Sequence, residues 1–255
     1  MLCNGERISF AQHRLRVHSC AAALQAMGLQ RGDAVAVFMG NRMELLELYR
    51  ACALLGVVMV PVSPLLQAPG VAMVLEDAQI RAIFAQGSLL PVLDTLRPQF
   101  PGIATQHWIS VDSADTGYPR YADLLASAPA LATVAEVDPE APFNIMYSSG
   151  TTGTPKGIVL THRIRMAYAL QLGAALAVRT DSVVMHSGSL VFNGSFTTLM
   201  PAWLQGCTYI LEAQFDAERF LDTVRREAVT HVMMVPSQVA AMLAAPNFSV
   251  EALGS

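Results

Sequence analysis

Charged residues are scarce in this sequence. Asp, Glu, Lys and Arg make up 14% of the chain, against 53% apolar residues. The formal net charge is −4, and no cluster of basic residues stands out. Nucleic-acid binding needs such a cluster to neutralise phosphates, so we do not expect nucleic acid as a partner. With 255 residues the chain can bury a full core, in one large domain or in two small ones.

Cysteines are also few and far apart. The four of them form no CxxC pair, and no two of the six histidines are spaced as HxxxH. A disulfide framework or a zinc site would need closer spacing, so we expect no metal ligands in this chain. Three of the cysteines have apolar neighbours, which indicates packing in the core of a protein in a reducing compartment. The four are Cys3, Cys20, Cys52 and Cys207.

Long uninterrupted apolar runs are missing as well. The longest run, Ala51 to Leu66, is broken by Gly56, Pro61 and Pro64, and it is too short to span a bilayer. The first ten residues, MLCNGERISF, lack a basic region followed by an apolar core, so no secretory signal is expected. The expected location is the cytoplasm.

Short apolar runs alternate with amphipathic segments of helix length. Strands are expected at 34–39, 57–62, 81–85, 107–111, 143–147, 158–160, 183–185, 208–212 and 230–235. Helices are expected at 43–55, 71–78, 89–96, 165–178, 194–204 and 217–227, with a last one opening at Pro236-Ser237. Asn41 and Asp216 are expected helix caps, and Gly56 is an expected helix stop. Continuous apolar strands separated by helices predict an α/β fold with parallel-type sheets sandwiched by helices.

The most informative stretch is YSSGTTGTPKGIVLTH, residues 147–162, in which seven consecutive residues are Ser, Thr or Gly. Glycines at 150, 153 and 157 let backbone N–H groups turn toward a common point. Together with the hydroxyl groups and the charge of Lys156, they suit the oxygens of a polyphosphate. The spacing matches neither G-x-x-x-x-G-K-[ST] nor G-x-G-x-x-G. By composition alone, a flexible connection between two strands is the alternative.

The string YSSGTTGTPKG resembles the signature of the adenylate-forming superfamily, the AMP-dependent synthetases and ligases. The resemblance is strongest over residues 29–64 and 143–243, and it is closest to the acyl-CoA synthetases that activate fatty or aryl acids. It implies that the loop binds the phosphates of ATP, with Lys156 as the catalytic residue that neutralises the leaving pyrophosphate. The implied phosphate-binding residues are Ser148, Ser149, Gly150, Thr151, Thr152, Gly153, Thr154, Pro155, Lys156 and Gly157.

The resemblance also implies an acyl pocket. The run SLVFNG, residues 189–194, stands where relatives commonly carry Pro-Leu-Phe-His, so Phe192 takes the place of a pocket-gating histidine. The alternative is that Phe192 is a core residue. His186, six residues earlier, is expected to be structural. The implied pocket residues are Phe192, Asn193, Gly194, Val235, Pro236 and Ser237.

The chain departs from the family pattern at its ends. The family's Tyr-Gly-x-Thr-Glu segment, its ribose-binding aspartate and its late lysine have no counterpart here, and neither does its Mg²⁺-binding glutamate. We therefore expect residues 1–255 to be a partial N-terminal domain, with an approximate inner division near 127–142 and with the C-terminal domain absent.

The implied function is part of an acyl-CoA synthetase, which converts a carboxylic acid and ATP into acyl-AMP and pyrophosphate and then forms the CoA thioester. Such an enzyme uses ATP, Mg²⁺ and CoA. One alternative is an adenylation domain that loads a carrier-protein thiol; another is a non-catalytic nucleotide-binding fragment. Apolar residues around Phe192 and Met234 favour an aliphatic or aromatic acid. A hydrolase is not supported, because no G-x-S-x-G occurs. Whether the protein forms oligomers is left open.

Overall fold

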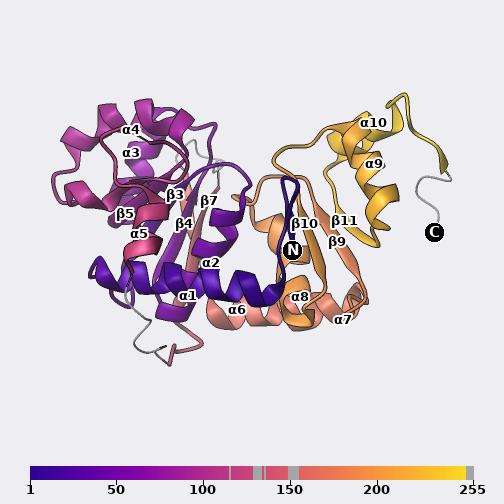
Figure 1. Ribbon diagram of the computed structural model, residues 1–255, viewed down its shortest axis with the longest axis horizontal. Helices are drawn as coiled ribbons and strands as arrows, with labels where there is room; N and C mark the ends of the chain where they lie inside the picture. Colours follow the sequence, from indigo (N-terminus) through magenta and orange to yellow (C-terminus); the bar gives the residue numbers. More distant parts are fainter. Residues whose placement is uncertain (115, 129–133, 135, 149–154, 251–255) are drawn as a thin grey trace. The chain divides into compact units, whose positions relative to one another are not determined.

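The computed structural model describes residues 1–114, 116–128, 134, 136–148 and 155–250 (Figure 1). The chain divides into two compact units. Unit 1 consists of Met1–Phe10 and Arg165–Ser255, and unit 2 consists of Ala11–Ile164. Each unit is built around one sheet of its own.

The sheet of unit 2 has the strand order β6-β5-β3-β4-β7-β8. Its strands are β3 (Ala34–Phe38), β4 (Val58–Val62), β5 (Ile80–Ala85), β6 (Trp108–Ser110), β7 (Pro142–Ser148) and β8 (Lys156–Thr161). Neighbouring strands run parallel except β7 and β8, which form an antiparallel pair. All residues of β3 and β4 are buried, as expected for strands covered on both faces.

Helices cover both faces of this sheet. They are α1 (Phe10–Ala26), α2 (Met43–Leu55), α3 (Ala68–Asp77), α4 (Leu90–Leu96) and α5 (Tyr121–Ser127), with short turns η1 (Gly87–Leu89), η2 (Arg97–Gln99) and η3 (Thr105–His107). Alternate strand residues face opposite sides. On one side Phe38 and Val60 share a core with Val71 of α3 and Leu93 of α4. On the other, the ring of Phe84 meets Tyr121 of α5 edge to face, with centroids 6.1 Å apart.

The sheet of unit 1 has the order β11-β9-β10-β1-β2. Its strands are β1 (Leu2–Cys3), β2 (Glu6–Arg7), β9 (Val183–His186), β10 (Thr208–Leu211) and β11 (His231–Met233). Only β1 and β2 pair antiparallel among these described strands. The helical segments are α6 (His162–Ala167), η4 (Tyr168–Leu172), α7 (Gly173–Ala175), η5 (Asn193–Ser195), α8 (Phe196–Gln205), α9 (Ala217–Glu227) and α10 (Pro236–Leu243). Met185 and Ile210 share a core with Phe220 of α9 and Met242 of α10.

Helix ends follow two of the three expected signals. Gly56 ends α2 with φ 68°, a left-handed conformation that glycine adopts at little cost. Asp216 caps α9 by accepting a hydrogen bond from the Arg219 N–H at 2.9 Å. The expected cap at Asn41 is wrong: Arg42 is the residue preceding α2, and its side chain makes no capping hydrogen bond.

The fold class is the expected one, with two local differences. The helix expected at 165–178 is instead α6, the π-helical turn η4 and α7 in succession. The antiparallel β7–β8 pair adds an edge hairpin to an otherwise parallel sheet. Residues 127–142, near the expected inner division, belong to unit 2; the division into domains stays a prediction. The four cysteines are free, as expected, and all are buried.

Candidate functional site

The described ends of the Ser/Thr/Gly motif lie on the two strands β7 and β8 of unit 2. Ser148, the last residue of β7, is directly opposite Lys156, the first residue of β8. The hairpin thus holds the two ends of the Ser/Thr/Gly segment side by side. The intervening motif residues 149–154 lie outside the described part of the chain. Pro155, Lys156 and Gly157 lead into β8.

This hairpin opens at an edge of the sheet where ligands are commonly bound. β7 runs parallel to β4, so Ser148 lies at the carboxyl-terminal edge that the parallel strands share. Open parallel sheets bind ligands just outside the carboxyl ends of their strands. The motif therefore occupies a position suited to a binding loop.

Gly157 and Tyr147 anchor the base of the hairpin. They are paired in register, and a Cβ placed on Gly157 would lie only 3.1 Å from Cζ of Tyr147 and 3.0 Å from Cγ2 of Ile145. The Tyr147 hydroxyl donates a hydrogen bond to Asp77, the last residue of α3. Burial and then this hydrogen bond raise the pKa of Tyr147, so the phenol stays protonated and continues to donate. The contact fastens the hairpin to α3.

Lys156 is exposed, and it is the only lysine of the sequence. Its side chain forms no ion pair and no hydrogen bond with any described residue. A flexible ammonium group at this position can therefore turn toward an anion held by the loop.

The first part of the expected acyl pocket is a turn in unit 1. The chain leaves the carboxyl end of β9 at His186 and reaches Phe192, whose side chain is 58% exposed. The turn is closed by the N–H and the hydroxyl of Ser195, which donate to the Phe192 carbonyl at 3.1 and 2.6 Å. Since Phe192 is exposed, the alternative that it is a core residue of this unit does not fit its environment.

The second part of the expected pocket follows β11. Val235 precedes α10, and Pro236 and Ser237 are its first residues, as expected for the last helix. Met233, the last residue of β11, brings the two parts together: its Cε fills the space beside Gly194, 2.3 Å from where a Cβ would be. Both parts thus lie at the carboxyl ends of the parallel strands β9 and β11.

His186 is buried beside this turn, with 1% of its surface exposed. Burial lowers its pKa to about 4, and the backbone of Ser189 and Gly188 counteracts this only in part. The imidazole is therefore neutral at pH 7, in keeping with the expected structural role.

Sequence reasoning missed a buried charge next to the turn. Arg165 of α6 is 1% exposed, and its Nη1 donates to Oδ1 of Asn193 at 2.9 Å. The sequence offers no pattern that identifies it, because a single arginine at the start of an amphipathic segment is ordinarily solvent-exposed.

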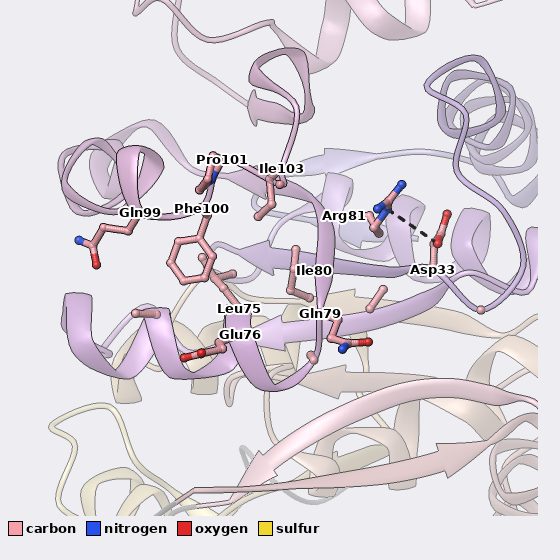
Figure 2. A pocket seen from close by; sticks show the side chains of 15 residues that line it. Asp33, Leu75, Glu76, Gln79, Ile80, Arg81, Gln99, Phe100, Pro101 and Ile103 are labelled. Atoms are coloured by element: carbon pink, nitrogen blue, oxygen red, sulfur yellow. Dashed lines mark ion pairs between the residues drawn. The ribbon is translucent and has the colours of Figure 1, made fainter.

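A cavity of about 810 Å³ lies in unit 2, at the amino-terminal ends of the strands and so away from the end that carries the motif (Figure 2). It is lined at the amino ends of β3 and β5, where Arg81 Nε and Asp33 Oδ1 form an ion pair at 4.0 Å. Leu75 and Phe100 supply apolar surface. Of the expected site residues that the structure describes, none lines this cavity, so it is separate from the motif.

The comparisons with known proteins agree with the motif. The model of the AMP-binding enzyme family matches residues 1–255, so the chain belongs to this family. Long-chain-fatty-acid–CoA ligase FadD13 of Mycobacterium tuberculosis is 32% identical over 245 residues, 95% of this chain and 47% of that protein. Indoleacetate–CoA ligase of Aromatoleum aromaticum is 30% identical over 255 residues, 97% of this chain and 48% of that protein.

A solved structure supports the fold. The inhibitor-bound N-terminal domain of FACL13 from Mycobacterium tuberculosis matches with a TM-score of 0.87 at 31% identity, covering 96% of this chain and 60% of that one. The chain spans about half the length of the curated relatives it matches.

Two features are absent from the described part of the chain. A bilayer-crossing helix is not found among its residues. Nor do three His, Cys, Asp or Glu side chains of these residues gather as ligands for a metal ion.

Proposed function

We propose that this chain is the N-terminal part of an acyl-CoA synthetase. Such an enzyme joins a carboxylate to the α-phosphorus of ATP, releases pyrophosphate, and then transfers the acyl group from AMP to the thiol of CoA. The observation that carries the proposal is the β7–β8 hairpin, which presents Ser148 and Lys156 side by side at the carboxyl edge of a parallel sheet. The match to the AMP-binding family and the two CoA ligases at 30% identity or more support it.

In this proposal the residues from Ser148 to Gly157 grip the β- and γ-phosphates of ATP. Backbone N–H groups and hydroxyls donate to phosphate oxygens. Lys156 neutralises the charge that builds up on the departing pyrophosphate. Catalysis of this kind is electrostatic and positional, because the protein forms no covalent bond to the substrate. Mg²⁺ would accompany ATP, but the described residues offer no ligand cluster, so we assign it no protein ligand and no step.

The turn at Phe192 and the start of α10 would hold the acid. Phe192 and Val235 expose apolar side chains, 58% and 46% of their surface, at the carboxyl ends of neighbouring strands. Such a surface favours an aliphatic or aromatic acid over a charged one. The reduced cysteines and the small-molecule substrates fit a cytoplasmic enzyme.

The test is acid-dependent exchange of radiolabelled pyrophosphate into ATP by the full-length protein, with a panel of fatty and aromatic acids. Exchange that requires an acid supports adenylation, and its absence with every acid would leave only a nucleotide-binding role. Adding CoA, or a carrier protein bearing a phosphopantetheine thiol, then identifies the acceptor. Thioester formation on the carrier alone would favour an adenylation domain over a CoA ligase.

A further inference from the structure

Unit 1 contains a fully buried arginine that the proposed chemistry does not use. Arg165 lies on α6, and 1% of its surface is exposed. Burying a charge is costly unless hydrogen bonds and favourable contacts replace the lost water. The partners of Arg165 therefore show what the fold gains from it.

Three side chains surround the guanidinium group. Its carbon lies 3.7 Å from the ring centroid of Phe196, on α8, and 5.4 Å from that of Tyr168. Its Nη1 donates to Oδ1 of Asn193 at 2.9 Å, and Nδ2 of Asn193 donates to the Tyr168 hydroxyl at 3.1 Å. We call these four residues the Arg165 cluster: Arg165, Tyr168, Asn193 and Phe196.

The backbone on one side of the cluster is unusual. Tyr168 is the first residue of η4, a π-helical turn between α6 and α7. Single π-helical turns are rare within helices and are found frequently at functional sites. Here the turn contacts α8, and Tyr168 and Arg165 reach the same asparagine.

The cluster holds the segment that carries the proposed gate. Asn193 directly follows Phe192 and opens η5, so both polar ends of the Asn193 side chain are fixed from α6 and η4. Phe192 itself is exposed, and no described residue holds its ring by a hydrogen bond or a stacking contact. Its direction depends on the backbone of the turn, which the cluster and the Ser195 hydrogen bonds define.

We propose that Arg165 is a positioning residue for the acid-binding pocket. Through Asn193 it fixes the Phe192–Ser195 turn and thereby sets how far the Phe192 ring reaches into the space for an aliphatic or aromatic acid. This inference rests on the proposed function, because it takes Phe192 as the gate. Arginine suits the position because its planar group can stack on a ring and donate in its own plane, which a lysine ammonium cannot.

The first measurement is hydrogen exchange of backbone amides, which needs no activity. The amides of Ser195 and Phe196 donate to carbonyls of the turn. In Arg165→Met their exchange should become about tenfold faster or more, relative to peptides elsewhere in unit 1. Leu221→Ala is the matched control: Leu221 is fully buried on α9 and belongs to a core without any of the four cluster residues. It should destabilise unit 1 without selectively exposing the turn.

The second measurement is steady-state kinetics of the full-length protein. Arg165→Met should raise KM for the preferred acid about tenfold and flatten the preference among acid chain lengths, while KM for ATP changes by less than about twofold. Arg165→Lys keeps the charge without the planar stack, so it should restore stability more than it restores acid preference.

The outcomes separate this inference from the proposed function. Unchanged exchange in the turn, or KM values for acid and ATP that rise together in step with lost stability as in Leu221→Ala, would overturn the positioning role. A wild-type protein without acid-dependent activity would overturn the proposed function and the acid half of this inference. The exchange measurement would still decide whether Arg165 holds the turn.

Discussion

Lys156 is the residue on which the proposed chemistry depends most directly. It is the only lysine of the sequence and is exposed at the start of β8, directly after the loop that we propose binds phosphate. Replacing it by alanine in the full-length protein should slow acyl-AMP formation about tenfold or more, a loss of at least ~1.4 kcal/mol of transition-state stabilisation. Single-turnover formation of acyl-AMP at saturating ATP measures this. Lys156→Arg, which keeps the charge, should lose less. Acyl-AMP formation that is unchanged in Lys156→Ala would remove Lys156 from the mechanism.

Phe192 should act on which acid is accepted and not on how ATP is bound. Its side chain is 58% exposed, so truncation to alanine leaves no core cavity and should cost little stability. In the proposed acid site, removal of the ring would leave more room, so we expect Phe192→Ala to shift kcat/KM toward longer or bulkier acids, on the order of tenfold between neighbouring chain lengths. Competition assays with mixed acids read this ratio. An unaltered acid profile would show that Phe192 does not gate the acid site.

At the residue scale, the sequence identified site residues that belong to one continuous motif. It did not identify contacts between residues that are far apart in the chain. Ser148 and Lys156 lie eight positions apart in one motif, and the motif identified both. The hairpin register that places them opposite each other could not be predicted from it. The hydrogen bond from Tyr147 to Asp77 joins residues 70 positions apart. The Arg165 cluster likewise unites two stretches of the chain, residues 165–168 and 193–196, and no local pattern indicates that the arginine is buried.

At the element scale, strands were easier to predict than the first helix. β3 and β4 are continuous apolar runs, which only a covered sheet accommodates. α1 was not predicted, and its burial pattern shows why: His13 is fully buried, whereas Leu15 is 67% exposed. Helical periodicity assumes that apolar residues face the core and polar residues face the solvent, and these two residues do the opposite. The strand at 158–160 was expected, but the antiparallel direction of β8 was not, because a parallel and an antiparallel edge strand can have the same apolar run.

The end of β9 makes the stability of the protein depend on pH. Burial lowers the pKa of His186 to about 4 in the folded protein, whereas an imidazole in an unfolded chain titrates near 6.5. Between about pH 6.5 and about pH 4, the imidazole of His186 is therefore protonated in the unfolded chain but neutral in the folded protein. This contribution to stability is fully present above that range and is lost as the pH falls, by up to ~1.4 kcal/mol per pH unit.

The His186→Gln variant tests this dependence. Urea unfolding between about pH 7.5 and about pH 4.5 should show a smaller loss of unfolding free energy in His186→Gln than in the wild type. Leu221 is as buried as His186 but cannot titrate. The unfolding free energy of Leu221→Ala should therefore be lower than that of the wild type by the same amount at every pH. If the unfolding free energy of His186→Gln also differs from that of the wild type by the same amount at every pH, the imidazole titrates normally in the folded protein.

At the scale of the whole molecule, periodicity predicted layered α/β structure, but only the family resemblance predicted which one. Alternating strands and helices are compatible with many doubly wound folds. The division into two units, each with its own sheet, could not be derived from them, because β1 at the start of the chain pairs with β10 from its second half. Such long-range pairing leaves no trace in local sequence.

Residues 1–255 by themselves should bind ATP weakly and catalyse neither step. The family resemblance implies adenine-binding, ribose-binding and Mg²⁺-binding segments and a late lysine outside the stretch that these residues match, and the chain spans about half the length of its curated relatives. Its phosphate loop is rich in Ser, Thr and Gly, and ordering such residues on binding costs roughly 1–2 kcal/mol each in backbone entropy. A few phosphate contacts barely offset that cost when adenine and ribose contribute nothing.

The measurement is pyrophosphate release from ATP by residues 1–255, with Mg²⁺, CoA and a panel of fatty and aromatic acids. The full-length protein under the same conditions is the positive control. We expect acid-dependent release from the full-length protein and none above background from residues 1–255, because groups that stabilise the transition state must all be present to act as a unit. Turnover by residues 1–255 would mean that all the groups needed for catalysis lie within them. The family resemblance would then be wrong about where these groups are in the sequence.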